Sequence, residues 1–340
     1  MASTQTTSSI VVLKFGSSVL RSASDLPDAV QCIYRHVRSG RRVVAVVSAF
    51  AGETDRLFAE AQTHGLDREA TAEFVAEGER AAAAALVEAL RQCGLAATGC
   101  DPDVVSLHAV GPVLDAMLDS LDVVATRSII DEYAVTVLPG FFAIDTHGRT
   151  VLLGRGGSDL TAIWIADQLG ADCTLVKDVD GLYQRDPALP GPPPARLVQA
   201  SWRTAVAVGG RLLQRKAVEY AHVRHLKFSI TSPWSDSATL IGPGPDQAAP
   251  PVARPDRRLR VALLGCGTVG GGVLERLRSL ESRFEVTGVL VRDMAKHAHE
   301  LCNGPDFATN GEALLAERPD VVIELLGGQE PARTLIDRAL

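Results

Sequence analysis

The fold of this chain is decided by the stretch Leu152-Leu153-Gly154-Arg155-Gly156-Gly157-Ser158-Asp159, read together with Lys177-Asp178-Val179-Asp180-Gly181-Leu182-Tyr183-Gln184-Arg185-Asp186-Pro187. Three glycines in four positions leave backbone N–H groups unobstructed. Helical spacing from Leu160 to Leu169 places this loop at a helix N-terminus, where unpaired amides and the helix dipole favour phosphate. Ala171 to Val176 follows as a short apolar strand, and open α/β sheets bind ligands beyond the C-terminal ends of their strands. The stretch therefore predicts an anion-binding loop.

The N-terminal segments alternate strands and helices. Ile10 to Phe15 is a continuous β-type run, Asp25 to Ser39 has helical spacing, and Arg42 to Ala49 is a second buried strand. This alternation predicts an α/β fold with a doubly wound, mostly parallel sheet. The first strand delivers Lys14 to the turn Gly16-Ser17-Ser18, so Lys14 can neutralise a phosphoryl group that the amides of the turn cradle. An ordinary strand-to-helix turn is the alternative.

Further elements are expected up to residue 241. Gly78 interrupts an Ala-rich helix, where a glycine costs about 1 kcal/mol relative to alanine, so something is expected to approach the backbone closely there. The sequence Asp145-Thr146-His147-Gly148 predicts a hairpin turn. The remaining expectations are a long helix from Glu73 to Cys93, two helices between Gly94 and Arg127, a strand from Ala134 to Ile144, a helix from Ser201 to Tyr220, and closing strands at Phe228 to Ile230 and Thr239 to Ile241.

The composition indicates a soluble protein with small-molecule substrates. A chain of 340 residues, 46% hydrophobic and 22% charged, is long enough for two domains with cores of their own. Its net charge of -7 argues against a nucleic-acid partner, because phosphate backbones require a basic face. The six cysteines are scattered without a CxxC pair, the N-terminus is polar, and no apolar run is long enough for a membrane span. These features predict a cytoplasmic protein with reduced thiols and no membrane partner.

Two close histidine pairs, His222 with His225 and His297 with His299, raise the question of a metal site. Neither pair has a cysteine or carboxylate partner at metal-ligand spacing. The spacing therefore predicts no metal site that consists of protein side chains only.

A second unit is predicted after residue 241. The segment 242–258 is rich in Pro, Gly and Ala and is expected to link a domain at 10–241 to a domain at 259–340. A strand from Leu259 to Leu264 leads into Gly265-Cys266-Gly267-Thr268-Val269-Gly270, which opens a helix ahead of a second strand from Phe284 to Val291. This context predicts a partial Rossmann domain in which Gly265, Gly267, Thr268, Val269 and Gly270 bind a dinucleotide. Arg292 stands where an acidic ribose ligand is usual and can hold a 2′-phosphate, so NADP is expected in preference to NAD.

Three motifs in order carry a family resemblance: Lys14-Phe15-Gly16, GRGGSDLTA from Gly154, and KDVDGLYQRDP from Lys177. From Ile10 to Ile241 the chain resembles the catalytic domain of aspartate kinases of the amino-acid kinase superfamily. The resemblance implies phosphorylation of L-aspartate to 4-phospho-L-aspartate by ATP with Mg²⁺, in a homo-oligomer. It assigns catalysis to Lys14, Asp159 and Arg211, substrate binding to Ser48, Thr54, Glu79, Arg155 and Ser158, and ATP binding to Gly16, Ser17, Ser18, Lys177, Asp178, Tyr183 and Asp186. In these roles Asp159 positions Lys14, Glu79 receives the α-ammonium group, and Arg155 receives the α-carboxylate of aspartate.

The segment from Arg260 to Leu340 resembles the start of homoserine dehydrogenase, including Glu324 and the Gly327-Gly328 turn. The order of the two parts is that of bifunctional enzymes of the aspartate pathway, but no ACT segment stands between them, so kinase activity is expected to be insensitive to lysine and threonine. The resemblance stops with the chain, before the catalytic lysine and aspartate of that family. The segment is therefore expected to bind NADP weakly and to lack dehydrogenase activity.

Two other functions stay open. A superfamily kinase that acts on glutamate or on a nucleotide is possible, because DVDGLY is shared across the superfamily. A catalytically impaired scaffold for a dehydrogenase is the other alternative, because Ser17 stands where glycine is usual, Arg211 replaces a lysine, and Ala188 replaces an arginine.

Overall fold

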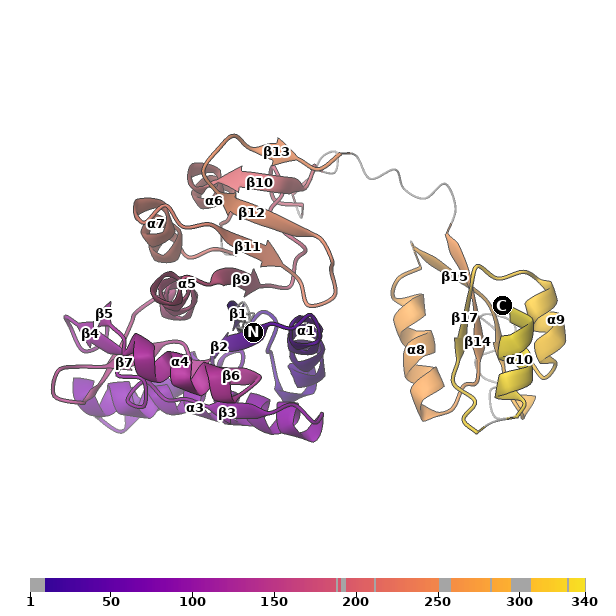
Figure 1. Cartoon of the computed structure of the whole chain (residues 1–340), viewed down its shortest axis with the longest axis horizontal. Helices are drawn as coiled ribbons and strands as arrows, with labels where there is room; N and C mark the ends of the chain where they lie inside the picture. Colours follow the sequence, from indigo (N-terminus) through magenta and orange to yellow (C-terminus); the bar gives the residue numbers. More distant parts are fainter. Residues whose placement is uncertain are drawn as a thin grey trace, which may run out of the picture. The chain divides into compact units, whose positions relative to one another are not determined.

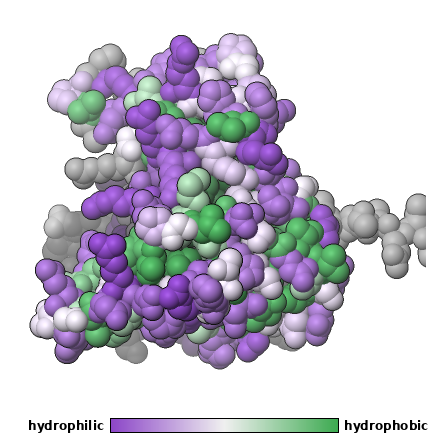
Figure 2. All heavy atoms as spheres, turned by 90° about the vertical axis from the view of Figure 1, so that its left-hand side faces the viewer, coloured by the Kyte–Doolittle hydropathy of each residue, from purple (hydrophilic) through white to green (hydrophobic). Residues whose placement is uncertain are grey.

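A computed structural model describes residues 10–187, 189–190, 194–210, 212–250, 258–281, 283–294, 307–328 and 330–339. The chain divides into two compact units, residues 1–251 and 252–340. Within the described residues, no helix has both the length and the apolar character needed to cross a bilayer. The face of the molecule in Figure 2 is mostly hydrophilic, with apolar side chains in several separate patches.

The first unit is built on a nine-stranded sheet with the order β13-β10-β12-β11-β9-β1-β2-β6-β3. Neighbouring strands are parallel except for the β11–β12 and β10–β13 pairs. Its central strands are continuous apolar runs, as expected for strands that helices cover on both faces. The strands are β1 (Ile10–Phe15), β2 (Arg42–Val47), β3 (Ala97–Gly99), β6 (Val135–Pro139), β9 (Asp172–Val176), β10 (Leu197–Ser201), β11 (Phe228–Thr231), β12 (Ala238–Gly242) and β13 (Gln247–Ala248).

Helices cover both faces of this sheet (Figure 1). Alternate residues of each strand enter different cores: Val12 packs on the face covered by α5, whereas Val11 and Leu13 pack on the face covered by α1 and α3. This arrangement confirms the doubly wound, mostly parallel sheet. The helices of the unit are the 3-10 helix η1 (Ala23–Asp25), α1 (Leu26–Arg38), α2 (Glu53–Thr63), α3 (Arg68–Gln92), α4 (Val123–Glu132), α5 (Gly157–Leu169), α6 (Trp202–Val208) and α7 (Arg215–Val223).

A second sheet of the first unit has the order β5-β4-β7-β8. Its strands are β4 (His108–Val110), β5 (Met117–Ser120), β7 (Phe142–Ile144) and β8 (Thr150–Leu152). The predicted hairpin turn at residues 145–148 joins β7 to β8, and the amide of His147 donates a hydrogen bond to the Asp145 side chain. The turn prediction is therefore confirmed.

Three segments differ from the elements predicted for them. Residues 94–127 form the short strands β3, β4 and β5 and only the start of α4, not two helices, because glycine and proline at several positions interrupt any helical run. The strand expected from Ala134 to Ile144 is divided at Gly140, where the chain passes from the large sheet to the small one. The helix expected from Ser201 to Tyr220 is divided into α6 and α7, since Gly210 has a positive φ of 48°.

The predicted linker 242–258 begins inside the first unit. Strand β13 pairs antiparallel with β10 at the edge of the large sheet. Just before β13, the Asp246 carboxylate accepts hydrogen bonds from the amide of Ser201 at 2.7 Å and the hydroxyl of Thr204 at 2.6 Å. A Pro/Gly-rich composition concealed this edge strand, because a two-residue strand leaves no periodic signal.

The second unit contains a parallel sheet with the order β16-β15-β14-β17. Helix α8 packs on one face with Leu274, and α9 and α10 pack on the other with Leu314 and Leu335. Its elements are β14 (Leu259–Leu264), α8 (Thr268–Arg278), β15 (Phe284–Leu290), β16 (Phe307–Ala308), α9 (Gly311–Ala316), β17 (Val321–Glu324) and α10 (Ala332–Ala339). The alternation of parallel strands and helices on both faces is that of a Rossmann-like segment.

Candidate active site

A cavity of about 1140 Å³ opens at the C-terminal ends of β1, β2 and β9, beside the N-terminus of α5. Among the residues assigned from the sequence, those that line it are Lys14, Gly16, Ser17, Ser18, Ser48, Thr54, Glu79, Ser158, Asp159, Lys177, Asp178, Tyr183 and Asp186. Arg155 is exposed and does not line the cavity. Arg211 and Ala188 lie outside the described residues.

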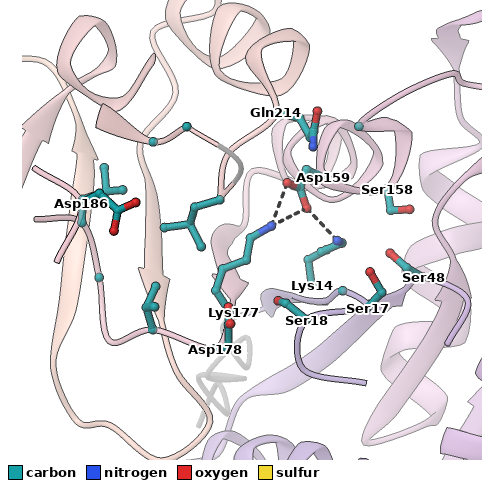
Figure 3. A pocket seen from close by; sticks show the side chains of 18 of the residues that line it. Lys14, Ser17, Ser18, Ser48, Ser158, Asp159, Lys177, Asp178, Asp186 and Gln214 are labelled. Atoms are coloured by element: carbon teal, nitrogen blue, oxygen red, sulfur yellow. Dashed lines mark hydrogen bonds and ion pairs between the residues drawn. The ribbon is translucent and has the colours of Figure 1, made fainter. Parts of the chain in front are cut away.

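The centre of the cavity is an ion-pair cluster of two lysines and one aspartate (Figure 3). Lys14 Nζ lies 2.7 Å from Asp159 Oδ1, and Lys177 Nζ lies 2.9 Å from Asp159 Oδ2. Burial by itself would raise the pKa of Asp159, but the two ammonium groups outweigh it and hold that pKa at about 2. Asp159 is therefore ionised at neutral pH and can fix both lysines.

The loop before α5 depends on glycine. Gly156 has a φ of +78°, and a Cβ there would lie 2.4 Å from Gln214 Cβ. Because Gly156 is the residue before the helix, it offers no side chain to cap α5. A bound anion can take that place at the first turn, as the sequence predicts.

Glu79 is buried in α3 and lines the same cavity. Its carboxylate accepts hydrogen bonds from the amides of Ala49 at 2.9 Å and Gly140 at 3.3 Å. Burial raises the pKa of Glu79 to about 7, although these amides act in the opposite direction. The close approach predicted at Gly78 is confirmed, because a Cβ there would lie 2.9 Å from Leu57.

The segment after Lys177 shapes the cavity further and borders a second one of about 530 Å³, which Asp178, Tyr183 and Ser232 help to line. The Tyr183 hydroxyl donates a hydrogen bond to Asp180 at 2.8 Å, and burial, followed by this contact, raises the pKa of Tyr183 to about 12. Gly181 has a φ of +142°, and a Cβ there would lie 2.4 Å from Thr239 Oγ1. The DVDGLY turn is thus held against β12.

Sequence reasoning missed part of the cavity wall. The end of α6 and the residues up to α7 contribute Ala207, Val208, Gly209, Gly210, Leu212 and Gln214. Gln214 belongs to no recognisable motif. The only signal that could have found it is the requirement for glycine at residue 156, which implies a close neighbour.

The glycine loop of the second unit lies between β14 and α8, as the sequence predicts. A Cβ on Gly265 would lie 2.6 Å from the Leu325 carbonyl oxygen, and one on Gly270 would lie 2.2 Å from the Gly265 carbonyl oxygen, whereas nothing lies within 4 Å of the Cβ position of Gly267. The first and third glycines thus permit close packing, and the second leaves space for a pyrophosphate. Val269 and Arg292 are exposed near this loop, while the side chain of Thr268 lies outside the described ones.

Within the part of the chain that the structure describes, no group of three or more His, Cys, Asp or Glu side chains could hold a metal ion. The rings of His222 and His225 pack against Trp202, with centroids 5.1 and 6.0 Å away. His297 and His299 lie outside the described residues.

Comparisons with known proteins find a family match in each unit. Residues 9–219 match the model of the amino acid kinase family, and residues 265–340 match the NAD binding domain of homoserine dehydrogenase. An aspartokinase of Helicobacter pylori is 30% identical over 239 residues, covering 68% of this chain and 59% of that protein. An aspartokinase of Corynebacterium efficiens is 30% identical over 288 residues, covering 80% of this chain and 68% of that protein.

Solved structures show the same fold. The crystal structure of aspartate kinase from Synechocystis superposes with a TM-score of 0.61 at 27% identity, covering 70% of this chain and 40% of that one. The chain spans less than two thirds of the length of several of the aspartokinases that it matches. The expected fold, an α/β sheet of amino-acid kinase type followed by a Rossmann-like segment, is confirmed. The chain therefore belongs to the amino acid kinase family, with an aspartokinase-like unit joined to a segment of homoserine dehydrogenase type.

Proposed function

We propose that the first unit is an aspartate kinase, which transfers the γ-phosphoryl group of ATP to the side-chain carboxylate of L-aspartate and forms 4-phospho-L-aspartate. The observation that carries this proposal is the cluster of Lys14, Asp159 and Lys177 beside the N-terminus of α5. Two ammonium groups and a helix N-terminus at one point suit a multiply charged phosphoryl group. The aspartokinase relatives supply the choice of acceptor.

The transfer needs positioning and charge neutralisation rather than proton removal. The acceptor carboxylate is already ionised at neutral pH, so its oxygen attacks the γ-phosphorus directly while the bond to the β-phosphate oxygen breaks and ADP leaves. Lys14, fixed by Asp159 at 2.7 Å, stands ready to offset the charge that spreads over the transferring group. Arg211 is assigned a similar task from the sequence alone.

The acceptor would lie between Glu79 and the hydroxyl groups of the cavity. Glu79 would hold the α-ammonium group of aspartate, while Ser48, Thr54 and Ser158 offer hydroxyls from the same cavity. Arg155 is exposed, so it has to turn toward the cavity to meet the α-carboxylate.

The nucleotide would lie between the Gly16–Ser18 turn and the DVDGLY segment. Asp178 and Asp186 supply carboxylates along this wall, and Mg²⁺ would enter with ATP, since Mg²⁺ prefers phosphate and carboxylate oxygens. The metal would offset phosphate charge when bound. Tyr183 adds an aromatic face at the border of the second cavity.

The experiment that tests this function is a coupled assay of ADP release with L-aspartate, L-glutamate and UMP as acceptors. We expect aspartate to give the highest kcat/KM. Lys14→Met should abolish turnover, whereas Lys227→Met, on an exposed lysine just before β11, should not change it. Equal turnover with glutamate or UMP would favour another member of the family. Undetectable Mg-ATP binding by calorimetry would favour a scaffold.

For the second unit we propose binding of NADP in preference to NAD, with Gly265, Gly267 and Gly270 around the pyrophosphate and Arg292 at the 2′-phosphate. Fluorescence titration should show that Arg292→Ala weakens NADP binding and leaves NAD binding unchanged. Arg283→Ala, at the opposite end of β15, is the matched control. An unchanged NADP preference in the Arg292→Ala variant would refute the assignment.

We also propose that several copies of the chain assemble into a homo-oligomer, which light scattering can measure.

A further inference from the structure

Lys177 reaches the ion-pair cluster because of its register in the sheet. On the central parallel strands Lys14 pairs with Leu175, so Lys177, just beyond the end of β9, lies two residues farther along the chain and on the same face. The Lys177 amide donates a hydrogen bond to the Thr231 carbonyl oxygen at 2.8 Å, which extends the ladder past the end of β9. Its backbone is therefore fixed to the neighbouring strand β11.

The charges at this point do not balance. Lys14, Lys177 and Asp159 are 5%, 6% and 2% exposed, so two ammonium groups and one carboxylate share a buried space. Asp159 already has Lys14 at 2.7 Å and does not require a second cation for its own neutralisation. A buried charge without its own partner is costly, so a second lysine here points to an anion that arrives from outside the chain.

Other groups near the cluster do not remove this excess of positive charge. Burial, and then the charge of Lys14, lowers the pKa of Lys177, while Asp159 acts in the opposite direction with the help of Asp178. Glu79 is nearby, but burial raises its pKa to about 7, which leaves it only partly charged at neutral pH. A phosphoryl group carries several negative charges and would balance this excess of positive charge.

We propose that Lys177 is a second catalytic cation, which contacts the transferring phosphoryl group together with Lys14. This inference rests on the proposed kinase function and deepens it. As the bond between the acceptor oxygen and the γ-phosphorus forms and the bond to the β-phosphate oxygen breaks, both ammonium groups stay protonated, and ADP leaves with the electron pair. Figure 3 shows both ammonium groups directed toward the Asp159 carboxylate, which holds the two lysines together at the cavity.

The test compares Lys177→Met, Lys177→Gln and Lys177→Arg with the surface control Lys227→Met. Calorimetry measures the Kd of Mg-ATP and of Mg-ADP, and urea unfolding monitors the fold of each variant. For Met and Gln we expect the Kd of Mg-ATP to rise about tenfold or more and the Kd of Mg-ADP to stay within about threefold, because only ATP carries the γ-phosphoryl group. Arg, which keeps the charge, should restore most of the affinity for Mg-ATP.

Turnover provides the second readout. A group that acts mainly in the transition state should lower kcat by about 100-fold in Lys177→Met and leave the KM for the acceptor nearly unchanged. Equal losses of Mg-ATP and Mg-ADP affinity, or wild-type values of both in a folded variant, would overturn the proposal. The calorimetric measurements of Mg-ATP and Mg-ADP binding do not depend on turnover. If the wild-type chain binds Mg-ATP and does not phosphorylate aspartate, only the proposed acceptor fails, and Lys177 is still judged by the two Kd values.

Discussion

The Ala49 amide donates a hydrogen bond to Glu79 across 2.9 Å, which joins the end of β2 to the middle of α3 inside the cavity. Burial raises the pKa of this carboxyl from 4.5 to about 7. If Glu79 holds the ammonium group of aspartate, the charged form is the one that binds. We therefore expect the KM for aspartate to fall as pH rises from about 6 to about 8, with little change in the KM for Mg-ATP. Glu79→Gln should remove this pH dependence.

The raised pKa of Glu79 also predicts how the stability of the protein changes with pH. Between pH 4.5 and about 7 the folded protein holds a proton on Glu79 that the unfolded chain has released, so the contribution of Glu79 to stability falls as pH rises through this range. Thermal unfolding measured over this pH range should show that the Tm of the wild type falls relative to the Tm of Glu79→Gln as pH rises. A constant difference between the two would contradict the raised pKa.

Two glycines with almost the same φ allow strain to be separated from function. Gly156 (φ +78°) would place a Cβ 2.4 Å from Gln214, whereas Gly148 (φ +74°), in the β7–β8 turn, has nothing within 4 Å. Gly148→Ala should cost about 1 kcal/mol of stability and leave Mg-ATP binding intact. Gly156→Ala should cost more and also weaken Mg-ATP binding, because the loop before α5 must shift. Equal ATP affinities in the two variants would refute the role of this loop.

Removal of the Asp159 carboxylate, which Lys14 and Lys177 share, should lower the stability of the fold. Asp159→Asn leaves two buried ammonium groups without their counter-charge, and we expect a loss of about 3 kcal/mol in urea unfolding at neutral pH. Asp172→Asn, which breaks only the exposed ion pair with Arg41, should cost less than about 1 kcal/mol. The pKa of Asp159 is lowered from 3.8 to about 2, so its contribution is present above pH 3.8 and is lost as pH falls through about 2. The deficit of Asp159→Asn should shrink in the same range.

The second unit offers another matched pair of glycines. Gly270→Ala would place a Cβ 2.2 Å from the Gly265 carbonyl oxygen, so we expect loss of dinucleotide binding. Gly272 is exposed in the same helix with nothing within 4 Å, and Gly272→Ala should stabilise α8 by up to about 1 kcal/mol without weakening binding. Dinucleotide titration and thermal unfolding of both variants test this. Normal binding by Gly270→Ala would contradict the assigned glycine roles.

The central strands, the loop before α5 and the glycine loop of the second unit could be predicted because their signals are local. A continuous apolar run ending in Lys14, or glycines ahead of a helical pattern, fixes an element and its end within a few residues. The roles of Asp159 and Lys14 came from motifs at matching intervals, and the structure places the two side chains in contact.

The other parts of the fold and of the site could not be predicted, because they depend on contacts that sequence periodicity does not encode. Strands β4 and β5 each have three or four residues, too few for an alternating pattern to stand out from turns. Gln214 reaches the cavity only because α7 packs beside α5. The ion pair between Lys177 and Asp159 follows from the parallel register of β1 and β9, which no local pattern reveals.

The position of β9 in the sheet has a consequence for how the first unit folds during synthesis. Strand β9 lies between β1 and β11, although β1 and β2 leave the ribosome far earlier. While synthesis continues, β1 can pair with β2 but keeps one edge open, and neither Asp159 nor Lys177 is yet in place. Closure of such a sequence-distant pair is slow compared with formation of the local elements. The proposed nucleotide binding can therefore begin only after β9 has entered the sheet, so the onset of binding during refolding would time the insertion of this strand.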